Sequence, residues 1–290
     1  VETVAFLAKE LVVRGNDIDV VRKFSNKYLS RLYAQSIGVP VPIFCEVDSA
    51  KQIELFIQIH GGKFILKPSD AQSSKGIHII SEDTSIEDIR LFLQDALRYS
   101  FTQKAILERF VNGYEITVEG FCSNGRHQVL AMSRKKHFKT GVASCLTYPG
   151  DIPTDIRRKI IDYDNLYVEQ SGLKFGPTHA EYIVDDTTGA FWLVEIACRG
   201  GGTLISSDIV KWVSGFDMQN AYIRSLEGEI IDIKSIVPKD RVAELHFFEF
   251  GAGRVTSVSG VDEVRCMDSV LMLDIPIKVG DIISSCVDDR

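Results

Sequence analysis

Two hairpin patterns in the middle of the sequence limit most strongly what this chain can fold into. In each hairpin, two strand-like runs flank a stretch rich in Asn, Asp and Gly; the runs are 115–122 with 129–136, and 178–184 with 191–197. Asn-Gly and similar short polar stretches between such runs are strong signals of antiparallel hairpins. A helical pattern over 154–172 separates the two hairpins. This mixture predicts an α+β fold with several sheets.

The segments on either side complete the predicted organisation. The N-terminal part alternates helical and strand patterns; helices are predicted over 17–37, 49–60 and 84–97, and strands over 64–67, 76–80 and 105–110. Gly38 and Gly61 mark the ends of the first two of these helices. Past the hairpins, two short helices at 205–213 and 217–226 precede short strand patterns with Gly-containing turns. The latter predict a small β-rich C-terminal piece.

Composition and charge exclude several classes of partner. The apolar runs are interrupted within a few residues, so no segment is long enough to span a bilayer. A net charge of −7 gives no general attraction to nucleic acid. The cysteines are scattered without a CxxC pair, which favours reduced thiols and a cytoplasmic protein. We therefore expect neither a membrane nor a nucleic-acid partner.

Glu181 and Glu195 are the most informative pair of residues in the chain. Both lie seven residues from Thr188, so folding the second hairpin about that residue places them opposite each other on one sheet face. Like charges directly across a ladder are destabilising by roughly 0.2–1 kcal/mol unless a cation, a shared proton or an arginine compensates them. Two oxygen donors without a nearby Cys cluster favour a hard ion such as Mg²⁺. The alternative is a solvated sheet face with a register shifted by one residue.

Arg199 and three glycines follow this strand directly, as Arg199-Gly200-Gly201-Gly202. A guanidinium and a glycine turn beside a metal carboxylate are suited to hold an anion. The alternative is a plain flexible loop.

A polar loop of small residues, 69–76, lies between two predicted strands and follows Lys67-Pro68. Small residues let backbone N–H groups approach phosphate oxygens, and Lys67 and Lys75 supply positive charge. The stretch is not a P-loop, because G-x-x-x-x-G-K-[ST] does not occur in the chain. The alternative is a surface hairpin loop with two ordinary lysines.

The segment Glu108-Arg109-Phe110-Val111, with Glu115 after it, forms a further cluster. An extended hinge with exposed main-chain groups between apolar side chains can recognise an adenine edge, and a nearby carboxylate can accept ribose hydroxyls. The alternative is a buried strand whose end carries charged residues.

Taken in this order, the clusters resemble the ATP-grasp superfamily, from about Lys23 to Leu226. The resemblance implies nucleotide contacts from several segments: Lys27, Lys67, Ser73, Ser74, Lys75, Gly76, Glu108, Phe110, Val111 and Glu115. Among these, Ser73 to Gly76 resemble the loop that closes over the triphosphate. Glu108 to Val111 resemble the adenine hinge, and Glu115 the ribose carboxylate. The metal is assigned by the same resemblance to Glu181 and Glu195.

The resemblance implies an ATP-dependent carboxylate–amine ligase, which forms an amide or peptide bond through an acylphosphate and releases ADP and phosphate. The implied cofactor is Mg-ATP, with Mg²⁺ or Mn²⁺, and the implied substrates are a small carboxylate and an amine. Arg199 and Lys67 would be catalytic, and His179, Arg199 and Gly201 would contact substrate. The family also allows a homodimer.

The same resemblance divides the chain into four parts. They are the tail of an N-terminal domain at 1–22, the small subdomain of the ATP-grasp fold at 23–111, its core subdomain with the metal site at 112–235, and a small β-rich C-terminal domain at 236–290. The last part resembles the C-terminal domain of the L-amino-acid ligase branch. Because family members usually carry an N-terminal α/β domain before the first long helix, we expect the chain to be a fragment.

One position departs from the family. An Asn commonly lies two residues after the second metal glutamate, and Ala197 occupies that place. Two alternatives to the ligase therefore stay open. One is a carboxylation like that of biotin carboxylase or carbamoyl-phosphate synthase, and the other is a nucleotide-binding regulatory module without turnover.

Overall fold

The computed structural model describes residues 1–71, 75–139, 142–236 and 239–284. The chain divides into two compact units, one formed by 1–136 with 145–245 and the other by 137–144 with 246–290. No helix in the described ranges has the length and apolar character needed to cross a bilayer. Among the described residues, Cys45, Cys122, Cys198 and Cys266 are free thiols.

The first unit begins with three helices, α1 (Glu2–Glu10), α2 (Ile18–Ser25) and α3 (Lys27–Ser36). The prediction of one continuous helix over 17–37 is wrong, because the chain breaks at Asn26. The backbone of Asn26 is extended, with φ −107° and ψ 118°, and its side chain accepts a hydrogen bond from Leu29 N. Asn26 therefore caps a second helix. The apolar periodicity runs through this break, which hid it from the sequence pattern.

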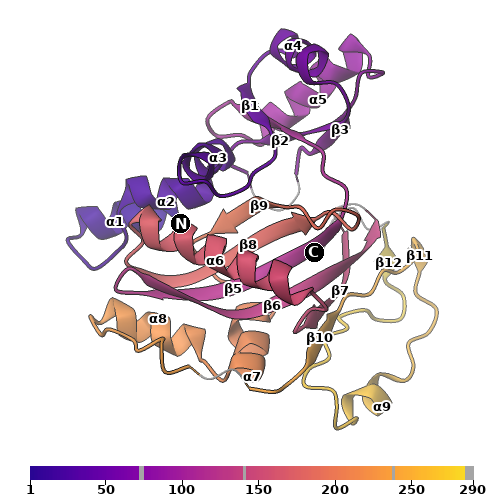
Figure 1. Ribbon diagram of the computed structural model, residues 1–290. Helices are drawn as coiled ribbons and strands as arrows, with labels where there is room; N and C mark the ends of the chain where they lie inside the picture. Colours follow the sequence, from indigo (N-terminus) through magenta and orange to yellow (C-terminus); the bar gives the residue numbers. More distant parts are fainter. Residues whose placement is uncertain (72–74, 140–141, 237–238, 285–290) are drawn as a thin grey trace. The chain divides into compact units, whose positions relative to one another are not determined.

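A four-stranded antiparallel sheet with the order β1-β4-β2-β3 follows. Its strands are β1 (Phe44–Val47), β2 (Phe64–Pro68), β3 (His78–Ile80) and β4 (Ala105–Arg109). Two helices, α4 (Ala50–His60) and α5 (Ile86–Arg98), pack on it (Figure 1). Their apolar side chains join Phe64, Leu66 and Leu107 in one core. The predicted helices and strands of this region are confirmed.

A six-stranded sheet with the order β10-β7-β6-β5-β8-β9 carries the predicted hairpins. Its strands are β5 (Tyr114–Ser123), β6 (Arg126–Lys139), β7 (Val142–Tyr148), β8 (Phe175–Val184), β9 (Phe191–Ala197) and β10 (Ala243–His246). Both hairpins are confirmed, since β5 pairs with β6 and β8 with β9 in antiparallel register.

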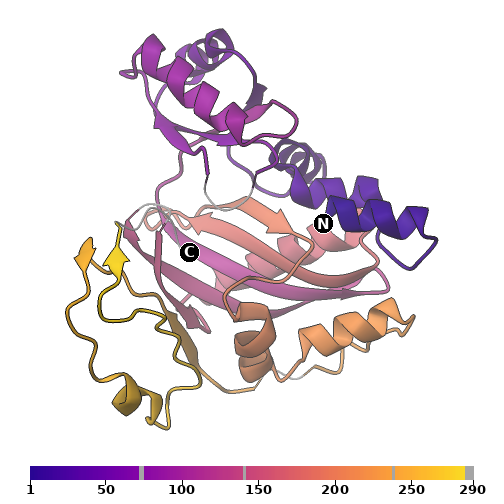
Figure 2. The same ribbon diagram turned by 180° about the vertical axis from the view of Figure 1, so that it is seen from behind.

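Helices lie on both faces of this sheet within the first unit (Figures 1 and 2). On one face, α6 (Thr154–Ser171) packs against Ile116, Val118 and Ala180 in a core that also includes side chains of α2 and α3. On the other, the segment of η1 (Ile205–Ile209), α7 (Val210–Ser214) and α8 (Met218–Leu226) contacts one end of the strands through Phe121–Phe216 and Phe175–Tyr222 ring pairs. The two helices predicted at 205–213 and 217–226 are confirmed by η1 with α7 and by α8. The rest of this second face is polar.

The second unit has little regular structure past residue 245. It contains the short antiparallel pair β11 (Gly253–Arg254) and β12 (Ile282–Ile283), and the helix α9 (Val261–Arg265). The β-rich character predicted for this part is therefore limited to short strands. Leu271 is 61% exposed and Ile282 75% exposed, and none of the described apolar side chains past residue 245 is buried. Without a buried face, long strands have nothing to pack against.

Candidate nucleotide and metal site

The polar face of the six-stranded sheet brings charged side chains from neighbouring strands together. On β5 and β8, Glu119 lies opposite His179 and Thr117 lies opposite Glu181. On β5 and β6, Glu115 lies opposite Lys135. Because directly paired residues share a face, all of these side chains project to the side away from α6.

Glu181 lies directly opposite Glu195 in the β8–β9 register, as predicted. The reason differs from the one that the symmetric hairpin suggested. Tyr182 pairs with Leu193, so the register shifts by one residue at Val194. Without this β-bulge, Glu181 would face Val194, and Glu195 would point to the apolar face. Bulges of this kind re-aim side chains and are enriched beside active sites.

The Glu181 carboxylate is partly exposed and lies among cations. Its Oε1 lies 3.4 Å from Lys135 Nζ and 3.7 Å from His179 Nε2. Burial alone raises the pKa of Glu181, but Lys135 and His179 outweigh it and hold that pKa well below its usual range. Lys135 also donates to Glu115 Oε1 at 2.6 Å. Glu115, the predicted ribose contact, is therefore part of the same charged network.

His179 is held by a residue that the sequence analysis did not single out. His179 Nδ1 lies 2.5 Å from Glu119 Oε1, and the Glu119 carboxylate is completely buried. Burial lowers the pKa of His179, but Glu119 and Glu181 raise it to about 10. The imidazole is thus a cation at neutral pH. Glu119 could have been found by its alternation with Glu115 and Thr117 along one strand face.

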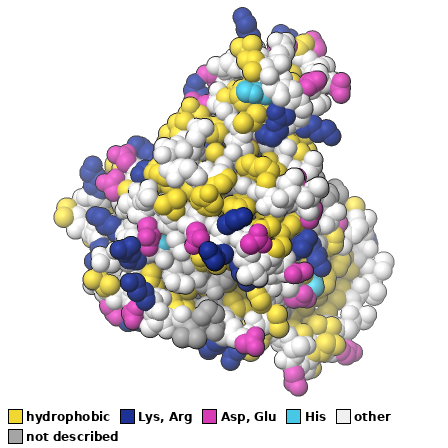
Figure 3. Space-filling view, viewed as in Figure 1, with side chains coloured by type: hydrophobic (Ala, Val, Ile, Leu, Met, Phe, Trp, Pro, Cys, Tyr) yellow, Lys and Arg dark blue, Asp and Glu magenta, His cyan; other side chains and the backbone are white. Residues whose placement is uncertain are grey.

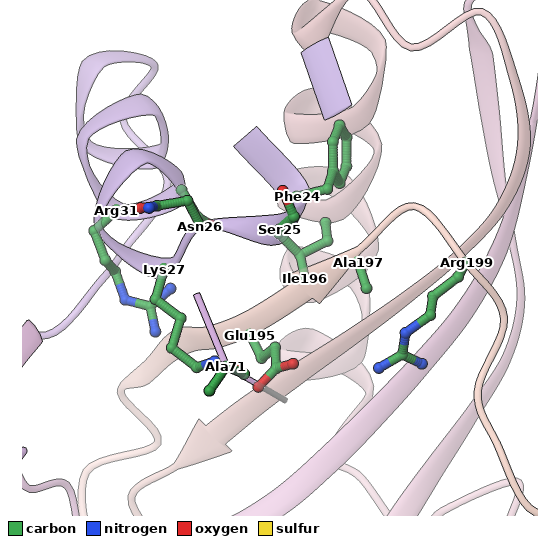
Figure 4. Close-up of a pocket in the computed structure, with 11 residues that line it drawn as sticks. Phe24, Ser25, Asn26, Lys27, Arg31, Ala71, Glu195, Ile196, Ala197 and Arg199 are labelled. Atoms are coloured by element: carbon green, nitrogen blue, oxygen red, sulfur yellow. Dashed lines mark hydrogen bonds between the residues drawn. The ribbon is translucent and has the colours of Figure 1, made fainter. Parts of the chain in front are cut away.

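Glu195 differs from Glu181 in having an open carboxylate. It makes no hydrogen bond or ion pair with the residues that the structure describes, and its charge interacts with Lys27. It lines a pocket with the end of α2, the start of α3, Ala71 and the end of β9. Figure 4 shows Lys27, Glu195 and Arg199 around this pocket. Three of the predicted site residues therefore meet in one place.

The Lys27 side chain lies at the N-terminus of α3. Its main-chain N–H donates to Ser69 O at 2.7 Å, and its Nζ donates to Ala71 O at 2.5 Å. Burial lowers the pKa of this ammonium group, and the nearby Glu195 acts in the opposite direction. Among the described residues Lys27 Nζ bonds a carbonyl oxygen and no carboxylate, so it can still donate to an anion at this pocket.

Glu108 lies in a buried ion cluster rather than at an exposed hinge. Its Oε1 accepts from Arg31 Nε at 2.5 Å, and its Oε2 lies 2.9 Å from Lys67 Nζ. Burial raises the pKa of Glu108, but Arg31 and Lys67 outweigh this effect and lower it to about 2. Its main chain runs in the middle of the sheet, with Phe44 and Ile65 as neighbours. Glu108 therefore lies in a buried part of β4, as the alternative described it.

The next hinge residues are partly engaged. Phe110 N donates to Lys63 O at 2.9 Å, which removes that amide from contact with a base. The predicted nucleotide contacts of Glu108, Phe110 and Val111 thus stay predictions.

The two ends of the loop 69–76 are described, whereas Ser73 and Ser74 lie outside the described residues. Gly76 has φ +65°, and an added Cβ would lie 2.9 Å from Tyr99 Cδ2 and 3.0 Å from Ala96 Cα. Glycine is required there both for its backbone conformation and for close packing. Lys75 Nζ lies 6.0 Å from the centre of the Tyr99 ring.

The glycines after β9 are required by packing. Gly201 N donates to Glu119 Oε2 at 3.2 Å, and an added Cβ on Gly201 would lie 2.8 Å from Glu119 Oε1. The turn therefore closes over the Glu119–His179 pair. Arg199 donates to Gly200 O at 3.1 Å and makes no ion pair with the described residues. Its charge is available at the pocket, while a substrate contact of Gly201 stays a prediction.

The donor set at Glu181 and Glu195 fits a hard divalent cation. Both side chains supply carboxylate oxygens, the ligands that Mg²⁺ and Mn²⁺ prefer, and they lie opposite each other in the β8–β9 register. Mg²⁺ is usually bound by one or two carboxylates together with substrate phosphates and water.

Positive charge is not spread over the surface. On the face that Figure 3 shows, the Lys and Arg side chains drawn in colour are scattered among acidic ones rather than gathered into one stripe. This distribution agrees with the net charge of −7.

Comparison with known proteins places these features in a family. Residues 61–208, just over half of the chain, match the model of the ATP-grasp domain. The chain is 27% identical over 202 residues to a D-alanine–D-alanine ligase of Coprothermobacter proteolyticus, covering 65% of this chain and 64% of that protein. It is 28% identical over 192 residues to the vancomycin C-type resistance protein VanC2 of Enterococcus casseliflavus, covering 61% and 52%. The chain thus spans less than two thirds of these relatives.

Solved structures agree on the fold. An L-amino acid ligase of Bacillus licheniformis superposes with a TM-score of 0.82 at 20% identity, covering 98% of this chain and 68% of that chain. A biotin carboxylase of Campylobacter jejuni superposes with a TM-score of 0.71 at 16% identity, covering 81% and 54%. The chain belongs to the ATP-grasp domain family, with the mixed α and β architecture that its sequence predicts.

Proposed function

We propose that this chain contains the nucleotide and metal site of an ATP-dependent carboxylate–amine ligase. The observation that carries the proposal is the pair Glu181 and Glu195, opposed on one sheet face, with Lys27 and Arg199 at the pocket that Glu195 lines. The relatives named as D-alanine–D-alanine ligases support an amide-forming reaction over a carboxylation.

The proposed reaction has two steps. An oxygen of the substrate carboxylate attacks the γ-phosphorus of ATP, the bond to the β–γ bridging oxygen breaks, and ADP leaves. The amine nitrogen of the second substrate then attacks the carbonyl carbon of the acylphosphate. Phosphate leaves with the electron pair of the C–O bond, and the nitrogen loses a proton to solvent. Phosphoryl transfer needs little covalent help from the protein but much charge compensation.

The chain's own residues supply this compensation in different ways. Lys27 and Lys67 would offset charge on the phosphates, and Glu108 keeps the Lys67 ammonium in place through the 2.9 Å ion pair. Arg199 would bind the acylphosphate or the acceptor carboxylate, since its guanidinium offers a planar fork of donors. A divalent ion held by Glu181 and Glu195 would act as a Lewis acid toward the phosphate oxygens. The His179 imidazolium adds a further fixed positive charge beside Glu181.

The test is ADP release by the purified protein with Mg-ATP and a panel of amino acids offered singly and in pairs. Glu195→Gln should lower substrate-stimulated ADP release by at least about 100-fold, because it weakens the metal site. Glu10→Gln, on the exposed surface of α1, is the matched control and should keep full activity.

Each other outcome has a distinct meaning. Unchanged turnover in Glu195→Gln would remove the metal assignment. Release that depends on bicarbonate alone would indicate carboxylation. Calorimetric binding of Mg-ATP without any carboxylate-stimulated release would indicate a regulatory module, for which Ala197 is the supporting departure from the family.

A further inference from the structure

Arg31 connects the two predicted halves of the Mg-ATP site, although it was not among the residues expected there. Its side chain is completely buried. One arm of the guanidinium contacts the four-stranded sheet at Glu108, and the other contacts the six-stranded sheet at Val194. We infer that Arg31 is a positioning residue that sets Glu195 and Lys67 together for the metal and the nucleotide. This inference rests on the proposed function.

The arm that contacts the six-stranded sheet holds the β-bulge. Arg31 Nη2 donates to the carbonyl oxygen of Val194, the residue that the β8–β9 register skips. That carbonyl belongs to the peptide bond joining Val194 to Glu195, so the contact orients the peptide plane from which the Glu195 side chain departs. Val194 is partly buried, and a main-chain carbonyl shielded from water needs a hydrogen-bond donor. Arg31 therefore stabilises the one backbone irregularity that turns Glu195 to the polar face.

The arm that contacts the four-stranded sheet restrains Lys67, which is proposed to contact phosphate. Arg31 Nε donates to Glu108 Oε1 at 2.5 Å, and Glu108 Oε2 lies 2.9 Å from Lys67 Nζ. Glu108 is 1% exposed and Lys67 is 13% exposed at the side chain. Lys67 is thus restrained by a carboxylate that is itself fixed by Arg31.

Only an arginine satisfies both arms. Its planar guanidinium presents donors in fixed, diverging directions, whereas a lysine offers one compact ammonium group. The third nitrogen, Nη1, is buried without a hydrogen-bond partner among the described residues, although Arg31 lines the same pocket as Lys27 and Glu195. A residue kept for packing alone would be apolar, because an unpaired buried donor is destabilising.

The experiment measures the dissociation constant of Mn²⁺ in the presence of ADP, by electron paramagnetic resonance, for the purified wild-type protein and Arg31→Lys. Residues that orient metal ligands typically change metal affinity by roughly 10–100-fold when substituted. We expect a weakening in that range for Arg31→Lys. Arg157→Lys is the matched control, since Arg157 also donates to a main-chain carbonyl, that of Gly150, but lies on α6 outside the site.

A second variant separates the arms and also serves if Arg31→Lys does not fold. Glu108→Gln keeps the contact of Arg31 with Val194 and removes the charge that restrains Lys67. It should weaken ADP binding measured without metal, while Mn²⁺ affinity changes less than in Arg31→Lys. If Glu108→Gln weakened ADP binding and Mn²⁺ binding equally, the two arms of Arg31 would not act separately, and this would contradict the inference.

The remaining outcomes distinguish this inference from the proposed function. If wild-type protein does not bind Mn²⁺ and ADP together, the proposed function fails. If it binds them, and Arg31→Lys lowers the Tm but leaves both dissociation constants unchanged, Arg31 has a structural role only and the inference is overturned.

Discussion

The two faces of the six-stranded sheet bury carboxyl groups in opposite surroundings. On the face covered by α6, Asp164 is 1% exposed and accepts a hydrogen bond from Tyr182 at 3.2 Å. Burial raises the pKa of Asp164 to about 7. On the other face, Lys135 and His179 hold the pKa of the partly exposed Glu181 well below its usual range.

The contrast shows what distinguishes a packing face from a site. Asp164 Oδ2 has no hydrogen-bond partner in the described part of the chain, and the nearest histidine, His127, has a pKa that burial lowers to about 4. The hydrogen bond from Tyr182 and the charge of His179 lower the pKa of Asp164 less than burial raises it, so burial decides its protonation. On the polar face, Lys135 and His179 keep Glu181 ionised, which is the form that binds a metal.

The largest expected effect tests the polar face. Glu181→Gln should lower substrate-stimulated ADP release by at least about 100-fold, since it removes a proposed metal ligand. It should also lower the free energy of unfolding by about 1–3 kcal/mol, because Lys135 and His179 lose their shared partner. Urea unfolding and the ADP assay measure the two effects.

Glu195→Gln is the comparison for this prediction, since the Glu195 carboxylate makes no hydrogen bond with the described residues. It should lose activity without losing stability. An equal loss of stability in both variants would contradict the different surroundings assigned to the two glutamates.

The next effect tests the packed face through pH. A carboxyl group whose pKa rises from 3.8 when unfolded to about 7 when folded stabilises the folded state below pH 4, and this contribution is lost as the pH rises to 7. The free energy of unfolding should fall by up to about 4 kcal/mol across this window relative to Asp164→Asn, which has no proton to lose. Urea unfolding of both proteins at pH 4.5 and 7.5 measures the difference. Parallel changes with pH would show that Asp164 does not titrate near 7.

The smallest effects compare adjacent residues on the two faces of β5. Thr117→Val removes a hydroxyl that forms hydrogen bonds with Ser133 at 2.6 Å and Tyr148 at 3.3 Å. It should lower the free energy of unfolding by about 1–3 kcal/mol, because these buried partners are left unpaired. Ile116→Val removes one methylene group from the core with α6 and should cost about 0.5–1.5 kcal/mol. Thermal and urea unfolding measure both. A larger loss of unfolding free energy in Ile116→Val than in Thr117→Val would contradict this order.

Local sequence signals predicted much of the fold and part of the site. The turn at 123–125 and the polar stretch 185–189 lie between strands that pair as neighbours, so local chemistry was sufficient to predict both hairpins. Lys27, Glu195 and Arg199 were singled out from separate segments, and the pocket brings them together. The break at Asn26 was missed because apolar spacing continues across it, although an Asn before a helix is a recognisable cap. The ion pairs of Glu108 could not be found locally, since its partners lie on α3 and β2.

The sequence by itself determined the alternation of strand residues, the turns and the two acidic side chains that the second hairpin presents. Only the tertiary structure decided that these side chains share one face. That outcome depends on the bulge at Val194, whose carbonyl is held by Arg31, 163 residues earlier in the chain. Strand periodicity describes neighbours along the chain, whereas the bulge is stabilised by a helix that folds against the sheet. A shift of one residue moves a side chain to the opposite face, and here a distant guanidinium selects the register.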